Sequence, residues 1–130
     1  MNYDTKNMRA ALRAANLRQD FTDWLRTDAD RLISAAVLLG GELWEERAAA
    51  VVDAIAFGAE PEEVVQDLDD LHRLLTLEYT DDIDSPEALC FQSVHPDDPR
   101  ADDARLCAEA LERGLEAIRK YAATTVKEVA

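Results

Sequence analysis

Residues 61–79 read PEEVVQDLDDLHRLLTLEY, and their apolar side chains recur at the spacing of an α-helix. Proline suits the first position of a helix, because the N–H that it lacks would have no partner inside the helix. The segment therefore predicts an amphipathic helix that begins at Pro61 and buries one side. The residues expected on that buried side are Val64, Val65, Leu68, Leu71, Leu75 and Tyr79.

Two further prolines stand in the same local context as Pro61. Pro86 and Pro99 each follow a polar residue and precede helix-compatible sequence. They predict a short helix from Pro86 to about residue 94 and a last helix from Pro99 to about residue 125. Residues 95–98 between these helices are expected to form a turn that contains Pro96.

The N-terminal half of the chain predicts three more helices. Met8, Leu12 and Ala15 lie on one face of the first helix, which Asn16 is expected to end. Paired glycines at positions 40 and 41 close the second helix and Gly58 closes the third, since glycine readily adopts the left-handed conformation of a helix cap. The predicted ranges are residues 4–15, 20–39 and 42–57.

Composition points to the same fold class. The chain has 130 residues, of which 48% are apolar and 6% aromatic. Alanine, the strongest helix former, supplies much of the apolar content, and no segment alternates with the period of a strand. We predict an all-α fold, a single-domain helical bundle over residues 1–130 with four longer helices and one short helix. Residues 1–16 are expected to pack loosely on this bundle.

The charge of the chain is concentrated in one part of the sequence. Residues 59–103, called the acidic segment below, hold fifteen Asp and Glu residues and only two basic residues, Arg73 and Arg100. This segment supplies −13 of the net charge of −14. Such a field repels nucleic acid and anionic membranes and attracts cationic partners. Solubility alone would be served equally well by an even spread of charge.

The outer side of the acidic segment is the predicted partner-binding site. Glu63, Asp67 and Asp70 stand at helical spacing, so their carboxylates form a stripe with steps of roughly 6 Å along the helix axis. That step is close to the spacing of phosphates along a nucleic-acid strand, so the stripe is a candidate for nucleic-acid mimicry. The other predicted contact residues are acids that helix-start chemistry does not explain: Asp69, Glu78, Asp81, Asp82, Asp84, Asp97, Asp102 and Asp103.

Patterns that would indicate a metal site are weak. Cys90, His95, Cys107 and His72 could form a zinc set, but the two cysteines do not stand at the short spacing typical of structural zinc sites. Asp69 and His72 form a single, altered copy of the element that a carboxylate di-metal bundle uses twice. The aspartates at positions 81, 82 and 84 lack the glycine and the terminal glutamate of a calcium loop. We predict no metal, no cofactor and no catalytic residue.

One spacing is that of a DNA-binding motif. Ala54, Gly58 and Val64 stand at the intervals of a helix-turn-helix, with Pro61 at the start of the second helix. The exposed side of that second helix is acidic and would face DNA phosphates with like charge. We therefore expect an ordinary pair of antiparallel helices and no direct binding of nucleic acid.

These observations favour a non-enzymatic binding protein, a regulator or inhibitor that docks its acidic face on a basic protein surface. A nuclease, a nucleic-acid-binding protein or a toxin would offer such a surface. The alternative is a structural module whose apolar helix faces form a homo-oligomer such as a dimer, and a third class is a metal-carboxylate enzyme centred on His72. The first four residues lack the features of a signal peptide, and the longest apolar run is about half of the ~20 residues that span a bilayer. We expect a cytoplasmic protein that does not insert into membranes.

Overall fold

The computed structural model describes the backbone of residues 2–95 and 97–129 and the side chains of residues 6–95 and 97–124. Within these ranges the chain forms α-helices and short 3-10 helices and no strand, which confirms the all-α fold. The elements in chain order are α1 (Asn2–Thr27), α2 (Ala29–Gly40), α3 (Glu42–Ala56), η1 (Pro61–Val64), α4 (Val65–Leu75), η2 (Glu78–Asp81), α5 (Pro86–Gln92) and α6 (Pro99–Val129). Pro96 lies outside the described residues.

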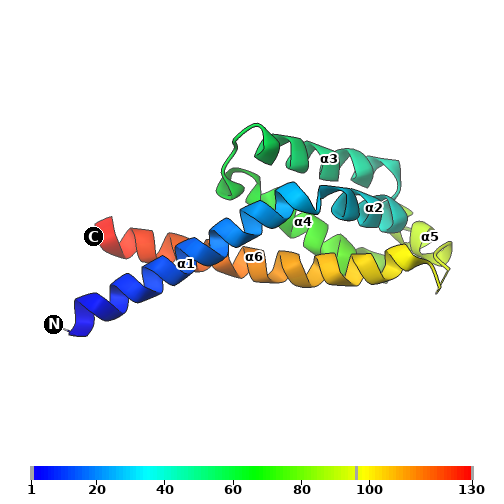
Figure 1. Cartoon of the computed structure of the whole chain (residues 1–130). Helices are drawn as coiled ribbons and strands as arrows, with labels where there is room; N and C mark the ends of the chain where they lie inside the picture. Colours follow the sequence, from blue (N-terminus) through cyan, green and yellow to red (C-terminus); the bar gives the residue numbers. More distant parts are fainter. Residues whose placement is uncertain (1, 96, 130) are drawn as a thin grey trace.

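The 31-residue helix α6 is the longest described helix and forms the base of the molecule (Figure 1). Its length of about 46 Å follows from the rise of 1.5 Å per residue. It contacts α1, α2 and α4, and α3 packs on α2 and α4 above it. The start of α1 and the end of α6 lie together at one end of the molecule, whereas α5 lies at the opposite end (Figure 1).

The core lies between α6 and the helices above it. Its fully buried side chains are mainly leucines, including Leu25 of α1, Leu32 of α2, Leu68 of α4 and Leu111 of α6. The α1–α6 contact is close, because a Cβ atom at Gly114 would overlap the ring of Phe21. Glycine at this position lets the two helix backbones approach each other.

The structure corrects the predicted boundary between the first two helices. Asn16 does not end a helix, and α1 continues without a break to Thr27. The chain changes direction at Asp28, whose non-helical backbone (φ −109°, ψ 23°) separates α1 from α2. Asparagine costs only a few tenths of a kcal/mol in a helix, and the packing of Ala14 and Phe21 on either side of Asn16 outweighs that cost. The predicted apolar face at Met8 and Leu12 is largely solvent-exposed.

The helix predicted from Pro61 is also shorter and less regular than expected. Its first turn is the 3-10 helix η1, and α4 ends at Leu75, so Tyr79 lies in η2. A 3-10 turn rotates about 120° per residue, which changes the phase of the apolar face and leaves Val65 exposed rather than buried. The helices that begin at Pro86 and Pro99 are confirmed. No helix in the described part of the chain is long and apolar enough to cross a membrane.

Candidate functional site

Most carboxylates of the acidic segment meet an arginine, and two of these arginines come from helices outside the segment. Arg18 of α1, Arg47 of α3 and Arg73 of α4 each contact two carboxylates. The predicted contact residues therefore fall into two groups, those that an arginine holds and those that it does not.

Arg18 fastens the start of the acidic segment to α1 and α6. Its guanidinium donates to Glu62 with an Nε–Oε1 distance of 2.5 Å and also pairs with Glu60. The same group lies over the ring of Tyr121 of α6, 4.8 Å from the ring centroid. The hydrogen bond from Arg18 lowers the pKa of Glu62, and the hydrogen bond to Glu62 raises the pKa of Arg18. Both shifts favour the charged pair in the folded protein.

Arg47 holds the predicted acidic stripe. Its Nη2 atom is 2.6 Å from Oδ2 of Asp70 and 3.4 Å from Oδ1 of Asp67, and its guanidinium lies 4.4 Å from the ring centroid of Trp44. Burial alone would lower the pKa of Arg47, but the hydrogen bonds to the two aspartates raise it. The third member of the stripe, Glu63, accepts a hydrogen bond from the backbone N–H of Glu60 as part of a capping box.

Arg73 and Arg100 hold further acids through contacts within the segment. Nε of Arg73 is 3.4 Å from Asp69 and 3.7 Å from Glu78. Arg100 binds Asp98 with an Nη2–Oδ2 distance of 2.7 Å. Arg73 is exposed to solvent, so each of its two pairs contributes at most about 1 kcal/mol to stability.

Asp81, Asp82 and Asp84 form the clearest exception. Together with Ile83 they make up the acidic turn, residues 81–84, and within the described residues none of the three carboxylates meets a basic side chain. A hydrogen bond nevertheless holds the backbone of the turn, since Oδ1 of Asp82 accepts from the N–H of Asp84 at 3.1 Å. The turn presents three uncompensated charges around one apolar side chain.

Three other predicted contact residues lie near the start of α6. Asp97 is 92% exposed and 3.9 Å from Nδ1 of His95, and Asp102 is 81% exposed and 3.8 Å from Arg105. Asp103 is partly buried and raises the pKa of the Cys107 thiol through its charge, in addition to the larger effect of burial. The eleven predicted residues thus come from η1, α4, η2, the acidic turn and the region around the start of α6.

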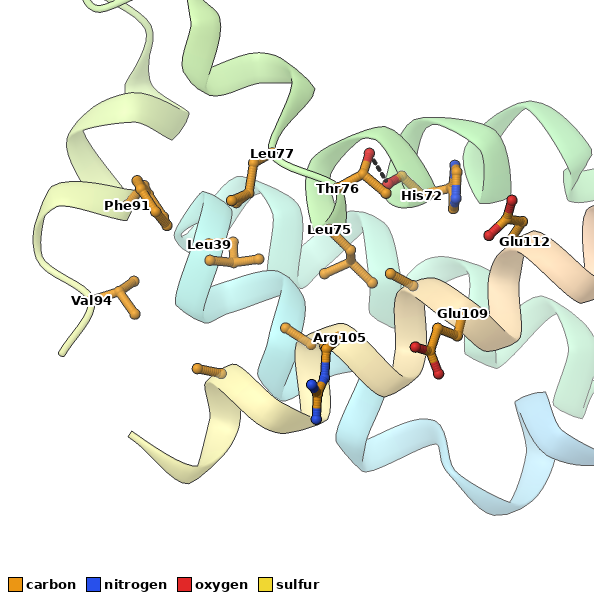
Figure 2. A pocket seen from close by; sticks show the side chains of 13 residues that line it. Leu39, His72, Leu75, Thr76, Leu77, Phe91, Val94, Arg105, Glu109 and Glu112 are labelled. Atoms are coloured by element: carbon orange, nitrogen blue, oxygen red, sulfur yellow. Dashed lines mark hydrogen bonds between the residues drawn. The ribbon is translucent and has the colours of Figure 1, made fainter. Parts of the chain in front are cut away.

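A groove between α4, α5 and α6 lies beside the acidic segment. It has a volume of about 450 Å³ and is called the α4–α6 groove below. Its lining residues are Leu39, His72, Leu75, Thr76, Leu77, Phe91, Val94, Ala101, Ala104, Arg105, Ala108, Glu109 and Glu112. Figure 2 shows the larger apolar side chains toward α5 and His72, Glu109 and Glu112 toward the other end of the groove.

The rim of this groove carries two carboxylates that sequence reasoning missed. Glu109 and Glu112 lie one helical turn apart on α6, are solvent-exposed, and meet no basic side chain in the part of the chain that the structure describes. Among the lining residues, Arg105 is the one that carries a permanent positive charge at neutral pH. No local motif marks the groove, because its lining comes from four helices far apart in the sequence. The available signal was the apolar run of residues 88–91, which contains Phe91.

The residues considered for metal binding are dispersed. No group of three His, Cys, Asp or Glu side chains within the described residues is placed to hold a metal ion. Cys107 is buried, and burial raises the pKa of its thiol to about 11, so the thiolate that a metal would need is disfavoured. Asp69 pairs with Arg73, while His72 lines the α4–α6 groove.

Comparisons with known proteins add no further assignment. No family model, curated protein or solved structure matches the chain.

Proposed function

We propose that the protein is a non-enzymatic regulator or inhibitor that receives a basic, amphipathic helical segment of a partner protein in the α4–α6 groove. The observation that carries this proposal is the combination of an apolar groove of about 450 Å³ with two rim carboxylates, Glu109 and Glu112, that have no basic partner among the described residues. The groove supplies what a charged surface alone lacks, a place in which apolar anchors are removed from water.

The apolar part of the groove suits the buried face of a helix. Its volume lies within the range of about 300–1,000 Å³ that is usual for ligand pockets. An amphipathic helix presents apolar residues at intervals of three and four, and such anchors fill grooves between helices in many complexes. Each leucine-sized side chain that becomes fully buried contributes about 1.5–3 kcal/mol. The floor near Leu39, Leu75 and Phe91 would contact these anchors.

The charges around the groove select a cationic partner. Glu109 and Glu112 can each pair with a lysine or arginine on the polar flank of the bound helix. Unpaired acids elsewhere in the acidic segment, above all those of the acidic turn, attract such a partner at long range and raise its rate of association. Basic helices are common in nucleases, nucleic-acid-binding proteins and toxins. We therefore propose a partner from one of these three classes, as the sequence predicted.

A strained backbone at the groove supports a binding role. Leu77 has φ +67°, the left-handed conformation, and is the only described residue other than glycine with a positive φ. This conformation costs a residue with a Cβ atom roughly 1–2 kcal/mol, and strained residues of this kind cluster at binding sites. Glycine or asparagine would fit the backbone better, but either would remove an apolar side chain from the groove lining.

Calorimetry with peptides tests the proposal. The probe is a helical peptide of leucine and lysine with all leucines on one face, and the comparison peptide has the same composition in scrambled order. We expect the amphipathic peptide to bind at least about tenfold more tightly than the scrambled one, because only its leucines can enter the groove together. Raising the salt from about 0.05 M to about 0.5 M should weaken binding without abolishing it, since the apolar contact is insensitive to screening.

Two variants locate the contact. Glu109→Gln/Glu112→Gln should weaken binding of the amphipathic peptide by about tenfold, which corresponds to 1.4 kcal/mol. Glu42→Gln/Glu46→Gln removes the same charge from exposed positions of α3 and is the matched control. The proposal is wrong if the two double variants lose affinity equally, or if the scrambled peptide binds as tightly as the amphipathic one.

A further inference from the structure

A second groove lies at the opposite end of the molecule and has the opposite charge. It runs along the contact between α1 and α6, has a volume of about 440 Å³, and is called the seam groove below. Its apolar lining consists of Ala10, Ala14, Leu17 and Ala123. Arg13 of α1 and Lys120 of α6 also line it, one from each helix. Lys120 pairs with Glu116 at 3.1 Å, whereas Arg13 meets no acidic side chain within the described residues.

The acidic turn is complementary to this groove, because it offers an exposed apolar side chain flanked by negative charges. Ile83 is 74% exposed although it is a large apolar side chain, and Asp82 and Asp84 flank it directly in the sequence. Ser85 links the residues before and after the turn. Its hydroxyl donates to the carbonyl of Tyr79 at 2.8 Å and accepts from the N–H of Ala88 at 3.0 Å. A turn that is ordered before binding loses little conformational entropy when it docks.

We propose that the seam groove of one copy binds the acidic turn of a second copy. Ile83 enters the apolar part of the groove, and the aspartates of the turn face Arg13 and Lys120. Among the described residues, the turn has three carboxylates without a basic partner, and the groove has a guanidinium without an acidic partner. The chain thus carries both sides of a complementary contact, and this makes a second copy the occupant that the charges favour.

The two sites lie at different ends of the molecule, so one copy can use its turn and its groove at the same time. The acidic turn precedes α5 at one end of the molecule, and the seam groove lies toward the start of α1 at the other end (Figure 1). A contact between two different patches of identical subunits closes into a symmetric dimer when two copies make it reciprocally, and it forms rings or open chains when they do not. Because the contact is small and each copy carries a charge of −14, we expect association that rises gradually with concentration.

Sedimentation velocity with two charge-reversed variants tests this inference. The seam variant is Arg13→Glu/Lys120→Glu. The turn variant is Asp81→Lys/Asp84→Lys, which leaves the hydrogen-bonding Asp82 in place. Wild-type protein should show a weight-average sedimentation coefficient that increases between about 10 µM and about 1 mM. Each variant alone should remain monomeric, because its turn and its groove then carry charges of the same sign.

An equimolar mixture of the two variants provides the decisive measurement. Every turn in the mixture meets a groove of opposite sign on the other variant, so association should return to at least half of the wild-type increase. Circular dichroism verifies that both variants are folded. A wild type that stays monomeric, variants that associate alone as the wild type does, or a mixture that fails to associate would each overturn the inference. The α4–α6 groove is unchanged in the seam variant, so its peptide affinity reports separately on the proposed function.

Discussion

Two stretches of the acidic segment are both rich in carboxylates but differ in whether basic side chains surround them. Residues 60–70 hold six acids and residues 81–84 hold three. The first stretch is fastened to the core by Arg18 and Arg47, whereas the acidic turn meets no basic side chain among the described residues. In the first stretch carboxylates connect helices, whereas in the second they form no ion pair with any other described element. A count of local charge therefore does not separate carboxylates that hold the fold together from those that form no internal ion pair among the described residues.

Among the tests of this comparison, substitution of Arg47 is expected to change the free energy of unfolding most. Arg47→Ala removes two aspartate contacts and the contact with Trp44 from one half-buried side chain. We expect the free energy of unfolding to fall by about 2–3 kcal/mol, because hydrogen bonds between charged groups contribute about 1.5–3 kcal/mol. Urea denaturation followed by circular dichroism measures it. Arg47→Lys keeps the charge and should recover part of the loss, while a decrease below about 0.5 kcal/mol would contradict the structural role.

A smaller effect with a defined pH dependence is expected at Arg18. Arg18→Ala should lower the free energy of unfolding by about 1–2 kcal/mol at pH 7, because Glu60 and Glu62 lose their partner. The pKa of Glu62 is lowered below its usual value of 4.5 in the folded protein, so its contribution is present above pH 4.5 and is lost as the pH falls through the folded pKa.

The acid side of the stability profile tests this assignment. Urea midpoints measured from pH 7 to about pH 3 should fall less steeply for Arg18→Ala than for the wild type, so the two curves converge in acid. Arg9→Ala on the exposed side of α1 is the matched control, and its curve should run parallel to that of the wild type. Parallel curves for Arg18→Ala would show that the pair does not stabilise the fold.

The smallest effect is expected at the acidic turn. The triple variant Asp81→Asn/Asp82→Asn/Asp84→Asn should change the free energy of unfolding by no more than about 0.5 kcal/mol, since these carboxylates hold no other element and asparagine can keep the Asp82 hydrogen bond. Asp67→Asn/Asp70→Asn, in the clamped stretch, should cost about 1–2 kcal/mol by the same measurement. Equal effects of the two sets would remove the distinction between the stretches.

Local sequence signals were sufficient for much of the fold. Pro61, Pro86 and Pro99 each begin a helical element, because the chemistry of a helix start is decided within one turn. The prediction failed at Asn16 and Asp28, where local preferences are weak and packing decides. A weak helix breaker ends a helix only if the flanking residues gain little by packing. Here the flanking residues pack on α6, which lies about a hundred residues away in the chain.

The candidate site was less accessible to sequence reasoning. Counting charges within residues 59–103 treated most acids as surplus, since Arg18 and Arg47 lie outside that window. The α4–α6 groove was missed for a related reason: its lining combines residues of α2, α4, α5 and α6, and a groove exists only once these helices are packed. The left-handed backbone of Leu77 has no sequence signature either, because leucine is an unfavourable residue for it.

The placement of the two tryptophans gives the molecule a built-in optical readout. Trp44 is buried beside Arg47, and its indole N–H donates to Glu87 at 2.9 Å, so its fluorescence reports on the attachment of the acidic segment. Trp24 lies half-buried beside Phe21 in a hollow between α1 and α6. Replacing either indole by phenylalanine leaves a single tryptophan in each case. The two variants thus report separately on the attachment of the acidic segment and on the packing of α1 against α6, without an added label.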